Sequence, residues 1–270
     1  MLVRLKTKNR SKKRNKKGIY ILPNLFTSCS LFGGVYAIIA AIQGRYDAAA
    51  IAILISSIFD GLDGKIARLT NTTSQFGTEY DSLSDLVAFG VAPGLLAFEW
   101  SLKSFGRFGW LAVFLYVICG ALRLARFNIQ KNNLESHRFK GLPIPGAAIF
   151  IATLVLFINS ISGITENRHI IIISTIYLLS FLMVSTIDYL SFKELELFKK
   201  KPFNVLVATI LLFIVVAYKP ALMLFLFSTI YVISGPSIML YHLTRRSKKT
   251  AHSMIDSSLE KSEKSIKNGL

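Results

Sequence analysis

Eight apolar runs of membrane-spanning length occupy most of this sequence and limit its possible folds more than any other feature. A helix needs about 20 mostly apolar residues to cross a bilayer. The runs cover residues 20–42, 47–67, 81–100, 109–127, 145–161, 169–187, 202–218 and 220–242. We therefore predict an all-α, polytopic integral membrane protein with about eight transmembrane helices.

The composition agrees with this prediction and leaves little sequence for anything else. Hydrophobic residues make up 52% of the 270 residues, and the mean hydropathy is +0.49, so no soluble domain of ordinary size remains. We divide the chain into a basic tail (1–18), a main unit of six helices (19–195), two further helices (196–244) and a polar tail (245–270).

The distribution of positive charge predicts the orientation in the membrane. The net charge is +17, and residues 4–17 hold nine Lys or Arg and no acid. Such a tail favours the cytoplasmic side and anionic lipids. Nucleic acid is the alternative partner for a basic tail, but for a membrane protein we expect none. The alternate connections, near Lys65, Arg138 and Lys199, are also basic, so both termini are expected on the cytoplasmic face of the cell (inner) membrane.

A more polar stretch, DGLDGKIARLTNTTSQFGTEYDSLSD (residues 60–85), covers the end of the second run and the start of the third and contains four aspartates. Asp60 and Asp63 end one predicted helix, and Asp81 and Asp85 begin the next. At 100° per residue each pair falls on one face of its helix. Two helices joined by a short turn would therefore direct four carboxylates toward each other, and these repel unless a positive charge lies between them.

Carboxylate oxygens in such a cluster predict a site for divalent cations. Oxygen ligands suit Mg²⁺, Mn²⁺ or Ca²⁺ rather than zinc, and all four histidines lie elsewhere. Two divalent cations can stabilise the attacking and leaving oxygens of a phosphoryl displacement, and one carboxylate could take the proton of an attacking hydroxyl. Metal-assisted phosphoryl transfer at the cytoplasmic edge of the membrane is the function that this pattern favours. Solvation of helix ends by acidic residues is the alternative.

Small residues and one arginine accompany the aspartates. Gly64 and Ala67 share the face of the first pair, and Gly77 shares the face of the second. A glycine costs a helix about 1 kcal/mol relative to alanine, which is understandable where a ligand approaches the backbone closely. Close helix packing is the alternative explanation. Arg68 could bind a diphosphate or serve only as an anchor at the membrane surface.

The complete spacing of these residues resembles a family signature. The residues and gaps are Asp60-x2-Asp63-Gly64-x2-Ala67-Arg68-x8-Gly77-x3-Asp81-x3-Asp85. This pattern is similar to the signature of the CDP-alcohol phosphatidyltransferases. The resemblance implies that two Mg²⁺ or Mn²⁺ ions are bound by Asp60, Asp63, Asp81 and Asp85. It also implies that Asp85 is the catalytic base.

The same resemblance implies a role for the remaining signature positions, and it suggests an oligomeric state. It assigns contacts with the CDP group to Gly64, Ala67, Arg68 and Gly77. It also leads us to expect a homodimer.

Stretches outside the signature resemble the bacterial and archaeal phosphatidylserine synthases of this family. They are residues 21–34, 81–94, 121–128 (ALRLARFN), 139–148 (FKGLPIPGAA) and 183–193. Gly146 departs from the pattern, since alanine is more usual there. The resemblance implies that CDP-diacylglycerol and L-serine are the substrates, and that attack by the serine hydroxyl gives phosphatidylserine and CMP.

Polar residues near these stretches are candidates for binding the remaining parts of the substrates. Arg123, Arg126 and Lys140 could hold the lipid phosphate or the serine carboxylate, or could be anchoring charges beside a membrane span. Asn24 and Thr27 could bind substrate, or could satisfy each other within the bundle.

Two other functions stay open at this point. A sibling enzyme that uses glycerol-3-phosphate, inositol phosphate or another alcohol would share every signature residue. A cation transporter would also bind ions through carboxylates, although transporter sites usually lie near the membrane midplane between repeats, and no internal repeat is visible in the sequence.

Overall fold

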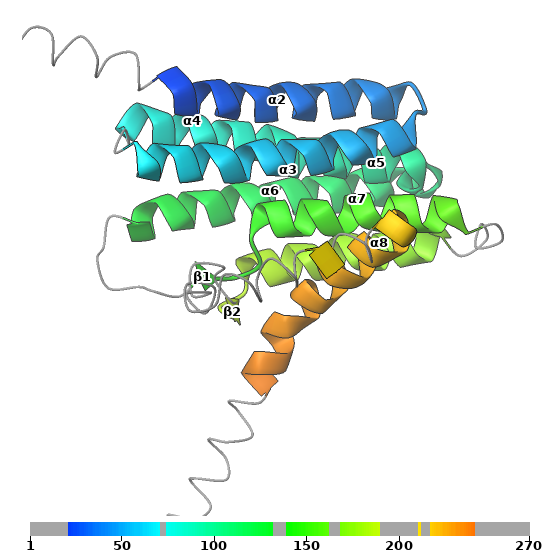
Figure 1. Cartoon of the computed structure of the whole chain (residues 1–270). Helices are drawn as coiled ribbons and strands as arrows, with labels where there is room; N and C mark the ends of the chain where they lie inside the picture. Colours follow the sequence, from blue (N-terminus) through cyan, green and yellow to red (C-terminus); the bar gives the residue numbers. More distant parts are fainter. Residues whose placement is uncertain are drawn as a thin grey trace, which may run out of the picture.

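The computed structural model describes residues 21–70, 74–131, 139–161, 168–189, 210–211 and 217–240. The helical segments in chain order are α2 (Ile21–Ile42), α3 (Tyr46–Leu69), α4 (Gln75–Asp85), the π-helical η1 (Leu86–Val91), α5 (Ala92–Trp100), the 3₁₀ segment η2 (Leu102–Phe105), α6 (Arg107–Lys131), α7 (Ile144–Ser160) and α8 (Arg168–Val184). A further helix covers Pro220–Leu240. Figure 1 shows α2 to α8 as a bundle, with the Pro220–Leu240 helix crossing it obliquely.

The prediction of a helical membrane protein is confirmed, whereas the count of eight spans stays a prediction. Four helices of the described residues are long and apolar enough to cross a membrane. These are Leu22–Ile42, Gln75–Trp100, Arg107–Ile129 and Pro220–Leu240. Two apolar helices, Ile144–Ser160 and His169–Val184, are shorter. The predicted run 202–218 lies mostly outside the described residues.

The sequence-based expectation was wrong about the end of the sixth run, which we extended to residue 187. The helix ends at Val184, and β2 (Asp188–Tyr189) pairs antiparallel with β1 (Phe139–Lys140). The backbone N–H of Gly141, which has a φ of 83°, donates to Ile187 O over 2.8 Å. Hydrogen bonds to the chain before α7 thus replace those that would continue α8.

Small residues let α2 and α3 pack closely along their length. The connection between them turns at Gly44, which has a φ of 74°. Fully buried alanines lie on both helices, at 37, 40 and 41 of α2 and at 49 and 50 of α3. Small side chains allow helix backbones to approach each other, as is common in membrane bundles. The two helices also meet toward their other ends, where the ring centroids of Phe26 and Phe59 are 6.3 Å apart, so the C-terminal half of α3 lies beside α2.

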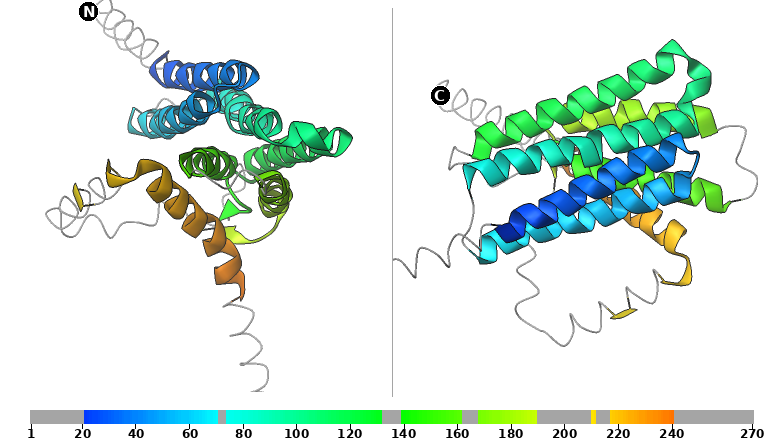
Figure 2. Two further views of the ribbon diagram at one scale, coloured as in Figure 1. Left: turned by 90° about the vertical axis from the view of Figure 1, so that its right-hand side faces the viewer. Right: turned by 90° about the horizontal axis from the view of Figure 1, so that it is seen from above.

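α7 lies in the interior of the bundle. The left view of Figure 2 shows it surrounded by α3, α5, α6, α8 and the Pro220–Leu240 helix. Its buried side chains, such as Ile144, Ile151 and Val155, have no exposed surface. Large apolar side chains on the outer helices are instead exposed, for example Phe32 at 73% and Phe181 at 69%. An apolar exterior of this extent fits contact with lipid.

Candidate functional site

The first half of the aspartate cluster lies on the last turns of α3. This helix is apolar up to Phe59 and polar afterwards, with Asp60 partly buried and Asp63 only 5% exposed. The face that carries them turns toward α2 and α4. α3 therefore directs both carboxylates into the bundle rather than toward solvent.

The second half lies on α4, whose start is set by a local cap. The Ser74 side chain accepts a hydrogen bond from Gly77 N over 3.0 Å, as an N-cap residue does. Asp81 and Asp85 follow at intervals of four residues and share one face of the helix. The helix continues without a break through η1 and α5, and η1 begins directly after Asp85. A π-helical segment inside a longer helix often marks a functional site.

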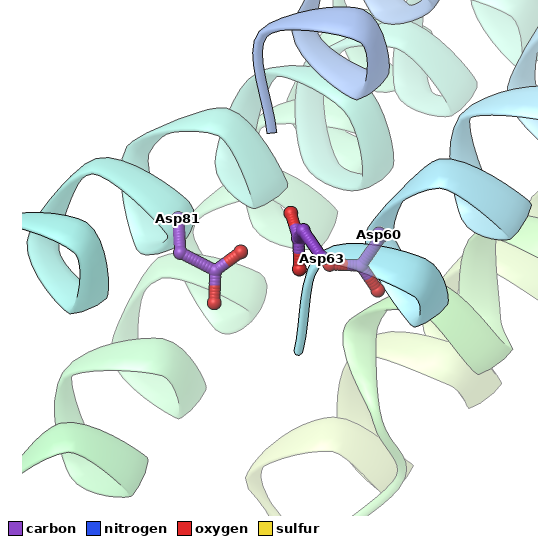
Figure 3. Close-up of side chains that lie close together, drawn as sticks. All are labelled: Asp60, Asp63 and Asp81. Atoms are coloured by element: carbon purple, nitrogen blue, oxygen red, sulfur yellow. The ribbon is translucent and has the colours of Figure 1, made fainter. Parts of the chain in front are cut away.

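The structure brings the aspartates of the two helices together. Carboxylate oxygens of Asp60, Asp63 and Asp81 all lie within 4.8 Å of one another. Figure 3 shows the Asp81 side chain pointing toward the pair from α3. The carboxyl group of Asp85 contacts that of Asp60, and its Oδ1 atom is buried without a hydrogen-bond partner among the described residues.

The chemistry of these four carboxylates fits hard divalent cations. Mg²⁺, Mn²⁺ and Ca²⁺ take oxygen ligands, and the described part of the cluster contains no histidine or cysteine. Four partly or fully buried carboxylates disfavour one another electrostatically unless cations neutralise them. The cluster and the unpartnered Asp85 oxygen are thus what a divalent-cation site requires.

α2 supports the cluster through hydrogen bonds that the sequence did not reveal. Thr27 Oγ1 donates to Asp63 Oδ2 over 2.7 Å. Ser84, which lies next to Asp85, donates to the backbone oxygen of Thr27 over 3.1 Å. The sequence suggests substrate or Asn24 as the partner of Thr27, and spacing within either helix does not indicate its contact with a signature aspartate. Ser84 is a candidate that sequence reasoning missed.

A second pair of contacts ties α4 to its neighbours and was also missed. The hydroxyl groups of Ser28 and Tyr80 lie 2.8 Å apart and connect α2 to α4. Asn128 Nδ2 on α6 donates to Ser82 Oγ over 2.9 Å. Ser28, Ser82 and Asn128 lie in stretches that resemble the family, and Tyr80 lies between two signature positions. Neither signal identifies which polar side chains of different helices meet.

Gly64 is next to open space. An added Cβ atom at Gly64 would meet no described atom within 4 Å. This argues against helix packing as the reason for this glycine, since Gly34, which does pack, would place a Cβ 2.6 Å from Ala88 Cα. A face that is open directly beside the aspartates leaves room for a ligand. Ala67 is partly buried on the same helix.

The other nucleotide-contact candidates lie around the same end of the bundle. Gly77 lies beside Asn24, whose Oδ1 would be 3.4 Å from a Cβ at Gly77. Arg68 is exposed, and its Nε donates to Gly64 O over 2.8 Å. Its guanidinium therefore stays near the open face that Gly64 leaves.

The three basic candidates differ in their surroundings. Arg123 is only 8% exposed, and its guanidinium interacts electrostatically with Asp85. Arg126 donates instead to the backbone oxygen of Val184 over 3.4 Å. Lys140 is in β1, where its backbone pairs with that of Asp188, and its side chain lies outside what the structure describes. Of the two candidates whose side chains the structure describes, Arg123 is the one whose charge interacts with a signature aspartate.

Comparisons with known proteins agree with this site. The family profile described as CDP-alcohol phosphatidyltransferase matches residues 20–187. A Helicobacter pylori protein named CDP-diacylglycerol–serine O-phosphatidyltransferase is 43% identical over 217 residues, which cover 80% of this chain and 90% of that protein. A Bacillus subtilis protein of the same name is 36% identical over 64% of this chain and 92% of its own length.

An archaeal protein extends the comparison. Archaetidylserine synthase of Methanothermobacter thermautotrophicus is 37% identical over 62% of this chain and 69% of its own length. The profile match includes all four clustered aspartates, α2 and the buried Arg123. This chain belongs to the CDP-alcohol phosphatidyltransferase family.

Proposed function

We propose that this protein transfers the phosphatidyl group of CDP-diacylglycerol to L-serine and forms phosphatidylserine and CMP. The observation that carries this proposal is the convergence of Asp60, Asp63 and Asp81 within 4.8 Å, in a chain whose relatives are named as serine phosphatidyltransferases. Phosphoryl transfer depends mainly on positioning and on stabilising the charge of the phosphate oxygens, and a cluster of this kind can serve both needs.

Asp60, Asp63, Asp81 and Asp85 are the residues that would hold the cations, two Mg²⁺ or Mn²⁺ ions per site. When bound, these cations supply positive charge against the diphosphate of the lipid substrate. Thr27 fixes the orientation of Asp63 by donating to its Oδ2 atom. Hydrogen bonds of this kind, behind the ligand, usually raise metal affinity.

We assign the role of general base to Asp85. Its Oδ1 atom, which no described residue hydrogen-bonds, can accept the proton of the serine hydroxyl as the hydroxyl oxygen attacks the lipid-side phosphorus. A bond forms between that oxygen and phosphorus, and the bond from phosphorus to the CMP oxygen breaks. CMP leaves as the phosphate monoester, and the proton on Asp85 passes to water. A positioned base of this kind typically contributes about 10²–10⁴-fold to the rate.

The remaining candidates divide between the two substrates. Gly64, Ala67, Arg68 and Gly77 would lie against the CDP group, which the open space beside Gly64 supports. Arg123 would bind the serine carboxylate, since it is a buried guanidinium close to Asp85, and a planar guanidinium matches a carboxylate. Arg126, Lys140 and Asn24 are weaker candidates, for the lipid phosphate or the nucleotide.

We further propose that the protein lies in the cytoplasmic membrane as a multi-pass homodimer with this site facing the cytoplasm. The basic segment of residues 4–17 supports this orientation and would attach to anionic lipids. A site at the cytoplasmic surface allows water-soluble serine and the membrane-held CDP-diacylglycerol to meet.

An assay of the purified protein tests the proposed function. CDP-diacylglycerol is supplied with a panel of alcohols that includes L-serine, glycerol-3-phosphate and inositol phosphate, and both CMP and lipid products are measured. We expect phosphatidylserine only with serine. Product with another alcohol instead would identify a sibling enzyme. Absence of CMP with every alcohol, together with cation flux into vesicles, would favour a transporter.

A further inference from the structure

The helix that carries the aspartates of α4 changes its hydrogen-bond pattern directly after Asp85. In η1 the backbone N–H of Ala92 donates to Val87 O, five residues earlier, whereas an α-helix joins residues that are four apart. The next residue is Pro93. A proline has no N–H, and its ring crowds the carbonyl four residues earlier, which here is that of Phe89. The wider π-helical turn accommodates this proline within a helix that continues through α5.

A tyrosine from another helix supplies the donor that Pro93 lacks. In an α-helix the carbonyl of Phe89 would accept from the N–H of residue 93. Instead, the hydroxyl group of Tyr116 on α6 donates to Phe89 O over 3.0 Å, and both side chains have no exposed surface. A buried carbonyl without a donor is costly. The hydroxyl group of Tyr116 therefore stabilises η1 in the interior of the bundle.

The same hydrogen bond recurs in the Pro220–Leu240 helix, without a π-helical turn. Pro236 removes the N–H that would donate to Val232 O in an α-helix. Tyr189 OH donates to that oxygen over 3.1 Å, and Val232 and Tyr189 are both buried. The chain is nevertheless α-helical on both sides of Pro236. A tyrosine that serves a carbonyl next to a proline thus does not by itself produce the pattern of η1.

η1 connects two segments that contacts with other helices hold in place. Most of α5 is buried, and its Trp100 Nε1 donates to Asn159 Oδ1 on α7 over 3.1 Å. α4 is held to α2 through Ser84 and to α6 through Ser82. A change of one residue in the register between α4 and α5 would turn α4 by about 100° and shift it by about 1.5 Å. The extra residue in the turn of η1 therefore determines where Asp85 points.

We propose that Tyr116 and Pro93 are positioning residues for the aspartates of α4. Together they maintain the π-helical turn, and this turn directs Asp81 and Asp85 toward the aspartates of α3. They act through the backbone that joins Phe89 to α4. This inference rests on the proposed function, because it takes the four aspartates as the site of the cations and of the proton transfer.

Pro93→Ala tests the role of the turn, because it restores the N–H and removes the ring that the wider turn accommodates. We expect kcat for CMP release to fall at least about tenfold, since a misplacement of about 1 Å can cost about 10²-fold. The affinity for Mn²⁺, measured without substrate by electron paramagnetic resonance of the free ion, should also fall about tenfold. Pro236→Ala is the matched control and should leave both quantities at their wild-type values.

Tyr116→Phe tests the hydrogen bond, because it keeps the ring and removes only the donor to Phe89 O. We expect kcat and the affinity for Mn²⁺ to fall as in Pro93→Ala. Tyr189→Phe removes the matched hydrogen bond, so it should lower the thermal midpoint in detergent similarly but leave kcat and the Mn²⁺ affinity unchanged. The effects of Pro93→Ala and Tyr116→Phe should not add, because the new N–H at residue 93 serves the same carbonyl.

Wild-type kcat and Mn²⁺ affinity in Pro93→Ala would overturn the proposal. A loss in Tyr116→Phe that Tyr189→Phe matches would also overturn it, since a general loss of stability would then explain both. All rates are measured well below the lowest thermal midpoint. Because kcat is compared with that of the wild type for whichever alcohol the protein uses, failure of the serine assignment leaves the test intact. If the wild type releases no CMP with any alcohol, the proposed function fails, and the Mn²⁺ affinity decides the role of Tyr116 and Pro93.

Discussion

Thr27 donates a hydrogen bond from Oγ1 to Oδ2 of Asp63 over 2.7 Å, and both side chains are buried. α2 thereby orients a carboxylate of the cluster although it contributes no aspartate of its own. Removing a partner behind a metal ligand typically costs about 10–100-fold in metal affinity or activity. Loss of this hydrogen bond should therefore change the metal concentration that the reaction needs.

Thr27→Val keeps the shape of the side chain and removes the donor. We expect the Mg²⁺ concentration for half-maximal activity to rise at least about tenfold, and Thr27→Ser to stay near wild type. Thr153→Val is a matched control, because Thr153 is also a buried threonine with a hydroxyl partner on another helix. A similar metal requirement in Thr27→Val and wild type would contradict this role of α2.

The open space beside Gly64 allows a substitution that should affect ligand binding without disturbing the packing of the helices. Gly64→Ala should not destabilise the fold, because a Cβ there meets no described atom within 4 Å, and alanine favours a helix by about 1 kcal/mol. The KM for CDP-diacylglycerol should nevertheless rise at least about tenfold, since the methyl group occupies space that the nucleotide needs.

Gly61→Ala provides the control for this substitution. Gly61 lies on the same helix, is equally open and is not part of the signature. Its variant should gain the same stability and keep the KM of the wild type. Equal kinetic effects of the two substitutions would show that the helix backbone, rather than a bound nucleotide, explains them.

The sequence was sufficient for features that depend on spacing within one helix. The apolar runs predicted the positions of α2, α3 and α6, and the four-residue interval of Asp81 and Asp85 predicted a shared face. The placement of Asp60 and Asp63 opposite them followed from the short connection between two helices. These features depend on the 3.6-residue period and on chain connectivity, which a single sequence contains.

Contacts between distant segments could not be predicted in the same way. Ser84 and Tyr80 contact α2 residues 57 and 52 positions away, and nothing in their local sequence distinguishes them from the other polar residues of α4. The β1–β2 pairing escaped prediction because each strand is two residues long, too short for a period-two pattern. The hydrogen bond from Tyr116 to Phe89 O depends on how two helices cross, which a single sequence does not specify.

Removal of divalent cations should destabilise the protein as well as inactivate it. The clustered carboxylates repel one another when no cation is bound, and a ligand at a hundredfold excess over its Kd stabilises a protein by about 2.7 kcal/mol. We expect EDTA to abolish CMP release and to lower the thermal midpoint in detergent, and Mg²⁺ or Mn²⁺ to restore both.

Asp60→Asn checks the electrostatic origin of this effect. The carboxyl groups of Asp60 and Asp85 contact each other, so a neutral amide should relieve the repulsion. In EDTA this variant should melt above the wild type, and Mg²⁺ should raise its midpoint less. A variant that melts below the wild type in EDTA would mean that repulsion within the cluster does not limit stability.

The assignment of the proton to Asp85 leads to the most specific kinetic expectation. Asp85→Asn keeps the size of the side chain but removes the base, and we expect kcat to fall by at least about 10²-fold. Asp47→Asn is the control at the other end of α3, where Asp47 Oδ1 accepts from Asn159 over 2.7 Å and an amide oxygen can do the same.

Release of CMP and binding of CDP-diacylglycerol are measured for both variants. Asp85 also belongs to the expected cation ligands, so its loss could act through the metal alone. Activity is therefore measured up to saturating Mn²⁺. Loss of a base lowers kcat at every cation concentration. Loss of a metal ligand lowers the affinity for the cation, and an excess of the cation then restores kcat. Recovery of kcat at saturating Mn²⁺ would remove Asp85 from the proton transfer and leave it as a ligand.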